Sequence, residues 1–221
     1  MFHPIVSKST PITLLGGGEV TSDTLSEALT RAPILVACDG GAKFALENNV
    51  QPVAVIGDMD SIDAASREKI GAERLFLVTE QDTTDFEKAL LRCEAPIMLG
   101  VGFTGARLDH ELAAFNALVH HDSKTVILLG GEDVVFRAPK SLRIDLPIGS
   151  RFSLFPMGHV RGTSEGLRWP INGLEFEPGG RIGTSNEVSG PVSLTFDAPH
   201  MLVILPRSAL KVAMDALYSA A

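Results

Sequence analysis

Acidic residues with short spacing stand out in the first half of the sequence as groups that could do chemistry. Asp39 precedes two glycines, Asp58 and Asp60 lie two residues apart, and Asp82 and Asp85 lie three residues apart. Each group follows a short apolar run. Carboxylates held close together repel one another unless a cation neutralises them, and Mg²⁺ takes oxygen ligands and bridges to phosphates. The pattern predicts a magnesium site that handles phosphate groups.

Glycine-rich segments follow two other apolar runs. Gly16 and Gly17 begin the first segment, and the second runs through Gly105 to Arg107 and Asp109. Glycine lets the backbone approach a phosphate closely at the start of a helix, and the planar guanidinium of arginine suits phosphate charge. Neither segment has the spacing of a Walker-type or dinucleotide-binding motif. We therefore expect phosphate contacts of another kind here.

Each acidic group also has a purely structural interpretation that the residues leave open. Asp39 with its glycines could shape a turn, and Asp58 and Asp60 could be turn and helix-cap residues. Asp82 and Asp85 could serve the positive end of a following helix. These interpretations would have to hold at several strand ends together, which favours the metal site.

The same holds for three other candidates. Asp109 could cap a helix, and Arg107 could form a surface ion pair with a neighbouring acid. Trp169, the single tryptophan, could belong to a core. Its neighbours Arg168 and Pro170 make it less core-like, and aromatic faces bind organic cations.

The elements that must position these residues follow from the apolar pattern. Runs that are apolar on successive residues indicate strands buried on both faces; they span residues 12–15, 34–38, 53–56, 75–78, 97–99 and 126–129. Between them lie helical stretches, among them an apolar stripe at Leu108, Leu112, Phe115 and Val119 and a helix opened by a Thr84–Glu87 capping box. Strand–helix alternation predicts a parallel sheet with helices on both faces. Its strands would deliver the acids to one edge, where ligands bind.

The second half of the sequence has a different residue pattern. Glycine and proline recur every few residues, and short runs with period-two alternation, such as Val192, Leu194 and Phe196, lie between them. This pattern is typical of antiparallel strands in a sandwich or small barrel. We expect an α/β domain over residues 1–138 and an all-β sandwich domain over residues 139–221.

Composition excludes some classes of protein. The formal net charge is −8 over 221 residues, whereas proteins that bind nucleic acid need a basic face. No run approaches the length of a membrane span, and the N-terminus lacks the shape of a signal peptide. We expect a cytoplasmic protein with neither nucleic-acid nor membrane partners.

Six segments, taken in order, resemble the thiamine pyrophosphokinase family; they span residues 38–42, 56–62, 81–89, 105–110, 163–169 and 184–186. The resemblance implies an α/β catalytic domain, a β-sandwich domain and a homodimer with its active site between subunits. It implies that the pyrophosphoryl group of ATP passes to the hydroxyl of thiamine, giving thiamine diphosphate and AMP, with Mg²⁺ as cofactor.

The resemblance also implies roles for particular residues. The catalytic set is Asp39, Asp58, Asp60, Asp82 and Asp85, of which the first three are the metal ligands. The ATP-binding set is Gly16, Gly17, Gly40, Gly105, Arg107 and Asp109. The thiamine-binding set is Trp169, Thr184, Ser185 and Asn186. The general base stays open between Asp85 and Asp60.

Two other functions fit the residues. One is a different magnesium-dependent transferase that uses a nucleotide and another alcohol at the same acidic edge. The other is a sensor that binds nucleotide or thiamine without catalysis, although loss of several aspartates would be expected there and none of the matched aspartates is missing.

Overall fold

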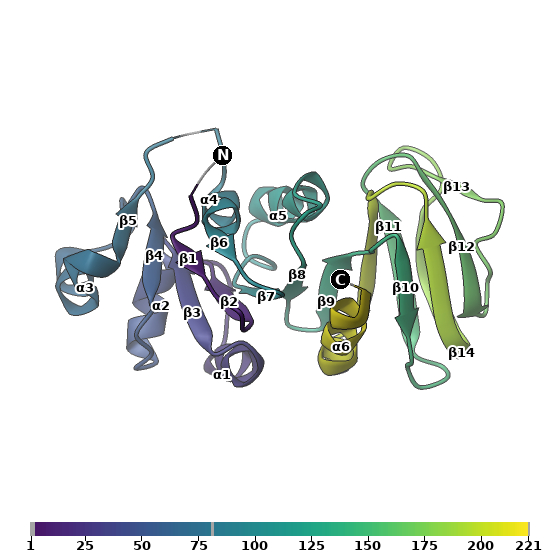
Figure 1. Ribbon diagram of the computed structural model, residues 1–221, viewed down its shortest axis with the longest axis horizontal. Coiled ribbons are helices and arrows are strands. Elements are labelled where there is room, and N and C mark those ends of the chain that lie inside the picture. The colour runs from purple at the N-terminus through teal and green to yellow at the C-terminus, as the bar shows by residue number, and fades with distance from the viewer. Residues whose placement is uncertain (1–2, 81, 221) are drawn as a thin grey trace. The chain divides into compact units, whose positions relative to one another are not determined.

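The structure is a computed structural model that describes residues 3–80 and 82–220 (Figure 1). Its contacts divide the chain into two units. The first comprises residues 1–114 and 128–131, and the second comprises residues 115–127 and 132–221. The expected domain boundary at residues 138 and 139 stays a prediction.

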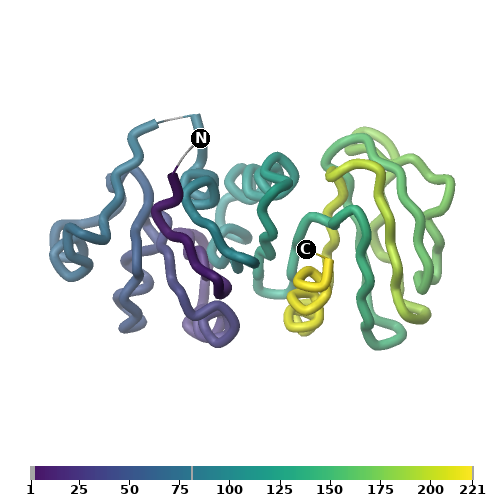
Figure 2. Tube along the Cα trace, in the orientation of Figure 1, coloured from purple at the N-terminus to yellow at the C-terminus, as the bar shows by residue number. Residues whose placement is uncertain are grey.

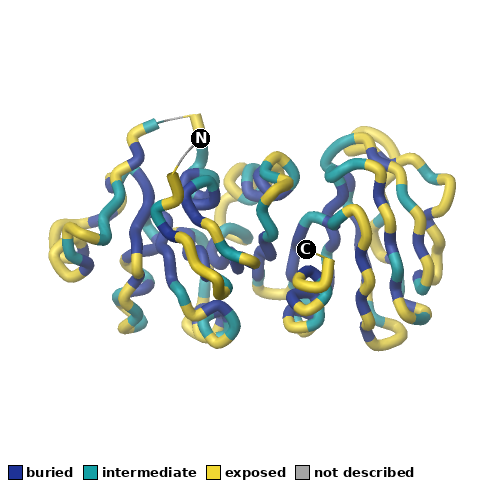
Figure 3. The backbone as a smooth tube through the Cα atoms, in the orientation of Figure 1, coloured by how far each residue is buried: buried dark blue, intermediate teal, exposed yellow. Residues whose placement is uncertain are grey.

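The first unit is built on a parallel sheet, which the apolar runs predicted. Its strands follow the order β7 (Met98–Val101), β2 (Ile12–Leu15), β3 (Ile34–Cys38), β4 (Ala54–Gly57) and β5 (Leu75–Leu77), and each neighbouring pair is parallel. β8 (Val126–Leu129) lies next to β7. Every residue of β2, β4 and β7 is buried, as expected for central strands covered on both faces (Figure 3).

β5 differs from this expectation. It lies at the edge of the sheet, none of its three residues is buried, and Leu77 is 64% exposed. An edge strand lacks a neighbour on one side, so less of the unit covers it. The prediction that this run is buried on both faces is wrong for that reason.

Helices flank the parallel sheet; they are α1 (Ser22–Arg31), α2 (Gly41–Glu47), α3 (Ala64–Ile70) and α4 (Asp85–Arg92), and a short 3₁₀ turn (Ala72–Arg74) follows α3 (Figure 1). The predicted capping box is present: the Thr84 hydroxyl accepts from the Glu87 amide, and the Glu87 carboxylate accepts from the Thr84 amide. The sequence patterns missed a two-stranded pairing of β1 (Val6–Ser7) with β6 (Cys93–Glu94).

α5 (Leu108–His120) confirms the predicted helix but not its expected buried stripe. Leu108 is 71% exposed and Leu112 is 53% exposed, whereas Ala114, Ala117 and Leu118 are buried. The smaller alanine side chains occupy the buried face, and periodicity of large apolar residues alone pointed to the wrong one.

The second unit is rich in antiparallel strands; they are β9 (Asp133–Arg137), β10 (Ser141–Ile144), β11 (Arg151–Pro156), β12 (Val160–Leu167), β13 (Glu175–Phe176), β14 (Gly183–Phe196) and β15 (Met201–Pro206). The first half of β14 pairs with β11, which continues to β15 and β9. Its second half pairs with β10 and β12, and β12 pairs with β13. The long strand β14 therefore joins two sheets, with Phe136, Phe152 and Phe176 fully buried.

A helix closes the chain. A 3₁₀ turn (Arg207–Ala209) leads into α6 (Leu210–Ala220), which packs on β10 and is yellow in Figure 2. Among the described residues, the longest apolar helices are too short to cross a membrane. The expected fold class, a parallel-sheet α/β domain followed by an all-β sandwich domain, is confirmed: the chain has a parallel α/β unit and a β-rich one.

Candidate active site

The topology of the parallel sheet creates a crevice between β2 and β7. The chain steps outward from β2 through β3 and β4 to β5, and then returns to β7 on the other side of β2. The strand order therefore reverses between β2 and β7, and open α/β sheets bind ligands at such a switch point. A cavity of about 370 Å³ lies there, and six of the predicted site residues line it: Gly16, Gly17, Asp39, Gly40, Asp85 and Arg107.

The two glycine-rich loops touch at this point. The Gly18 amide donates to the Gly102 carbonyl at 2.9 Å, and a Cβ on Gly16 would lie 2.5 Å from the same carbonyl oxygen. Any larger residue at Gly16 would force the loops apart. Glycine at this position is therefore required by the close contact of the two loops, in addition to the phosphate approach or tight turn that the sequence suggested.

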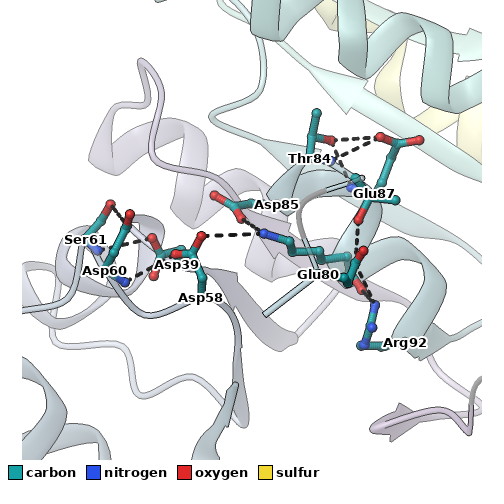
Figure 4. Close-up of polar contacts among 11 residues, drawn as sticks. Asp39, Asp58, Asp60, Ser61, Glu80, Thr84, Asp85, Glu87 and Arg92 are labelled. Atoms are coloured by element: carbon teal, nitrogen blue, oxygen red, sulfur yellow. Dashed lines mark hydrogen bonds and ion pairs between the residues drawn. The ribbon is translucent and has the colours of Figure 1, made fainter. Parts of the chain in front are cut away.

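Three carboxylates gather beside the cavity. Asp39 follows β3, and Asp58 and Asp60 follow the neighbouring strand β4. One oxygen of each lies within 4.8 Å of the others. Ser61 joins them: its amide donates to Asp39 Oδ2 at 3.4 Å, and its hydroxyl donates to Asp60 Oδ1 at 2.9 Å (Figure 4). The predicted gathering of acids at the sheet edge is observed for these three, which we call the acidic cluster.

The backbone of the acidic cluster is strained. Asp39 has φ 38° and Met59, between the other two aspartates, has φ 65°, a left-handed region that costs energy for a residue with a Cβ. Met59 is buried and packs in a core cluster with Ile62 and Ile70. Its burial directs the chain between Asp58 and Asp60 around a tight turn that keeps both carboxylates at the edge.

Asp39 has an unusual electrostatic environment. The residue is 2% exposed, and its Oδ1 atom is buried without a hydrogen-bond partner among the described residues. Burial raises the pKa of its carboxyl, hydrogen bonds from Ser61 oppose the shift, and the charges of Asp85 and Asp58 raise the pKa further. A buried acceptor that lacks a partner is costly, and a cation at the acidic cluster would satisfy it.

α4 adds two further charged residues: Asp85 lines the cavity, and Lys88 is buried beside it. Asp85, in its first turn, accepts from Lys88 Nζ at 3.2 Å, and the same ammonium lies 3.7 Å from Asp58 Oδ2. Lys88 received no predicted role, although its i, i+3 spacing from Asp85 was a usable signal. Asp82 is exposed and neither joins the acidic cluster nor lines the cavity.

Arg107 and Asp109 pair with each other, as the structural interpretation of Arg107 expected. Two hydrogen bonds join them, the shorter from Arg107 Nη2 to Asp109 Oδ2 at 2.6 Å, and both side chains are 66% exposed. These bonds raise the pKa of Arg107 and lower that of Asp109. Asp109 lies within the first turn of α5 and is not its N-cap. Gly105 lines a separate cavity of about 410 Å³.

In the second unit, the structure brings the predicted Trp169 close to Asn186. The Trp169 amide donates to Asn186 Oδ1 at 3.2 Å, and Asn186 Nδ2 donates to the Trp169 carbonyl at 2.8 Å. Trp169 is 54% exposed, which argues against the core interpretation, and the Arg168 guanidinium lies 4.9 Å from its ring centroid. Thr184 and Ser185 precede Asn186 on β14, and Ser185 has φ 61°.

Both halves of the chain match models of known protein families. Residues 25–129 match the thiamin pyrophosphokinase catalytic domain, and residues 140–201 match the thiamin pyrophosphokinase vitamin B1 binding domain. Thiamine pyrophosphokinase 1 of Oryza sativa subsp. japonica is 30% identical over 192 residues, which cover 72% of this chain and 73% of the relative.

Solved structures share the fold. Thiamin pyrophosphokinase from yeast aligns with a TM-score of 0.74 at 14% identity, over 99% of this chain and 95% of the yeast chain. Thiamin pyrophosphokinase from Geobacillus thermodenitrificans aligns with a TM-score of 0.72 at 21% identity, over 89% of this chain and 97% of that chain.

Fold and site together define an α/β enzyme with carboxylates at the switch point of a parallel sheet and a separate β-rich unit. In class it is a transferase of the kinase type. The chain belongs to the thiamine pyrophosphokinase family.

Proposed function

We propose that the chain transfers the pyrophosphoryl group of ATP to the hydroxyl of thiamine, giving thiamine diphosphate and AMP. Family membership supports the reaction. The single observation that carries its chemistry is the acidic cluster beside a glycine-lined cavity at the switch point of the parallel sheet. Phosphoryl-type transfer needs positioning and charge neutralisation more than covalent participation of the protein, and these residues are suited to both tasks.

Asp39, Asp58 and Asp60 would hold Mg²⁺. The donor set fits, because magnesium takes oxygen ligands, one oxygen from each aspartate lies within 4.8 Å of the others, and the buried Asp39 Oδ1 lacks a partner among the described residues. When bound, the ion neutralises phosphate charge and orients the transferring group. Retaining three carboxylates together without a cation would cost stability through their mutual repulsion.

The remaining residues of the first unit would bind ATP and assist the transfer. Gly16, Gly17 and Gly40 line the cavity and leave the backbone open to phosphate. Gly105, two residues before Arg107, would give the same access in the next loop. Arg107 and Asp109 form an ion pair at the start of α5, so the two would act together on the nucleotide. Asp82 would complete the acidic edge from the loop before α4.

A carboxylate would accept the proton of the attacking hydroxyl. Asp85 lines the cavity and is 44% exposed, and Asp60 is exposed in the acidic cluster, so both remain candidates. A general base must lie within hydrogen-bond reach of the proton that it takes.

Thiamine would bind through Trp169, Thr184, Ser185 and Asn186. The exposed indole offers its face to an organic cation, and two hydrogen bonds to Asn186 fix the backbone that carries it. In line with the family resemblance, we further propose a cytoplasmic homodimer in which each active site lies between subunits.

The test is incubation of the purified chain with Mg²⁺-ATP and thiamine, with chromatography of the nucleotides and thiamine species. Formation of AMP and thiamine diphosphate in equal amounts is expected. ADP in place of AMP would contradict pyrophosphoryl transfer. AMP formed only with another alcohol would indicate the alternative transferase, and binding of both substrates without turnover would indicate a sensor.

A further inference from the structure

Lys88 is a buried cation for which the proposed reaction has no direct use. It lies on α4, the helix that packs against β3 and β4, and its side chain is 4% exposed. Lysine is almost never buried to this degree unless it is paired. Its partners are Asp85 at 3.2 Å and Asp58 at 3.7 Å.

The two partners come from different parts of the site. Asp58 follows β4 and belongs to the acidic cluster, whereas Asp85 lies in the first turn of α4 and lines the cavity. One ammonium thus links the strand end that would hold the metal to the helix start that would face the substrate. Because it is almost completely covered, Lys88 acts through these carboxylates without touching a ligand.

The charge of Lys88 is fixed in place next to a site for a divalent cation. A bound metal ion and the Lys88 ammonium would therefore compete for the same carboxylates, since Asp58 belongs to the acidic cluster and lies 3.7 Å from the ammonium. Opposite charges at such distances attract strongly in a partly buried setting, and like charges repel equally. A fixed ammonium at this position would offset repulsion among the aspartates before a metal binds and would weaken the binding of that metal.

We propose that Lys88 is a positioning residue and permanent countercharge. It holds the carboxylates of Asp58 and Asp85 at a fixed distance from each other and limits the affinity of the acidic cluster for Mg²⁺. The proposal rests on the metal site of the proposed function. It separates two properties that usually change together, because loss of Lys88 should strengthen metal binding while impairing turnover. A residue with a merely structural role would weaken both.

The test is a calorimetric titration of the full chain with MgCl₂, without substrates, followed by steady-state kinetics. In Lys88→Met, which keeps the length of the side chain and removes its charge, the dissociation constant for Mg²⁺ should fall at least about threefold. At saturating Mg²⁺, kcat should fall about tenfold or more, and KM for thiamine should stay unchanged. Lys88→Gln serves where Lys88→Met does not fold, and Lys88→Arg, which keeps the charge, should restore an affinity close to that of the wild type.

Arg92 supplies the matched control. It is a second buried cation on α4, one turn beyond Lys88, and it lies 3.8 Å from Glu80. Arg92→Met should leave Mg²⁺ affinity within about twofold of the wild type. If Arg92→Met lowered the dissociation constant for Mg²⁺ as much as Lys88→Met does, the effect would be one of general charge, and the proposal would be overturned.

The remaining outcomes are also decisive. If the wild type binds Mg²⁺ and neither Lys88→Met nor Lys88→Gln binds it more tightly, the role of Lys88 is overturned. The proposed metal site is left intact in that case. Absence of any Mg²⁺ binding by the wild type overturns both.

Discussion

Asp58 and Asp60 lie on a short turn whose geometry is fixed from inside by buried Met59. We expect Asp58→Ala or Asp60→Ala to lower AMP formation about 100-fold or more, since a metal ion contributes several kcal/mol to the transition state. The measurement is kcat at saturating Mg²⁺-ATP and thiamine, together with circular dichroism to verify the fold. Turnover close to that of the wild type would refute the assignment of both residues to the metal.

Asp63 provides the control for this loop. It is three residues beyond Asp60 but outside the acidic cluster, and its carboxylate caps α3 by accepting from the Ser66 amide at 2.8 Å. This hydrogen bond, together with one from the Ser66 hydroxyl at 3.1 Å, lowers the pKa of its carboxyl. Asp63→Ala should therefore reduce stability and leave kcat unchanged. This control separates the effect of removing any carboxylate from this loop from the effect of removing a metal ligand.

Trp169 is exposed, so its removal should cost little folding free energy. If its face binds thiamine, Trp169→Ala should weaken thiamine binding by about 2- to 30-fold, which corresponds to a cation–π contribution of about 0.5–2 kcal/mol. The measurement is a thiamine titration, with KM for ATP as the internal reference. Ile148→Ala, which removes another exposed apolar side chain of the second unit, should leave the affinity unaltered; an equal affinity in Trp169→Ala would assign the indole a structural role.

At the scale of the element, α4 carries more of the site than any other helix. Its capping box satisfies the Thr84 and Glu87 amides, and the helix that begins there holds Asp85 and Lys88. Thr84→Ala should cost about 1 kcal/mol of stability in urea unfolding and also lower kcat several-fold, because the first turn positions Asp85. Asp63→Ala, which uncaps α3, should show the first effect without the second; the same result for Thr84→Ala would mean that α4 needs no cap to position Asp85.

The elements were predictable where one strong physical rule applied. Strands β2, β4 and β7 are apolar on successive residues because helices cover both faces, and the capping box is a local pattern. The failures have a common origin. Burial of β5, pairing of β1 with β6, and the buried face of α5 depend on which segments become neighbours, and local periodicity does not contain that information.

At the scale of the whole molecule, the proposed homodimer makes a distinctive prediction. A site built from the first unit of one subunit and the second unit of another should be complemented in mixed dimers of Asp58→Ala and Trp169→Ala chains. Each mixed dimer would have one intact site, so co-refolded equal amounts should recover about a quarter of wild-type activity. The measurement is the thiamine diphosphate formation rate at a thiamine concentration far below KM, where Trp169→Ala alone is impaired, relative to each variant alone. No recovery above the two variants would place each site within a single chain.

The sequence by itself determined the class of the fold, the family and the acidic residues that follow the strands, because these depend on local apolar pattern and on ordered motifs. The tertiary structure decided which acids meet: it gathers Asp39, Asp58 and Asp60, leaves Asp82 exposed, and pairs Arg107 with Asp109. It also placed Lys88 beneath the site. Such selection depends on strand order and on the direction in which buried neighbours such as Met59 turn the chain. These are non-local properties that residue spacing does not encode.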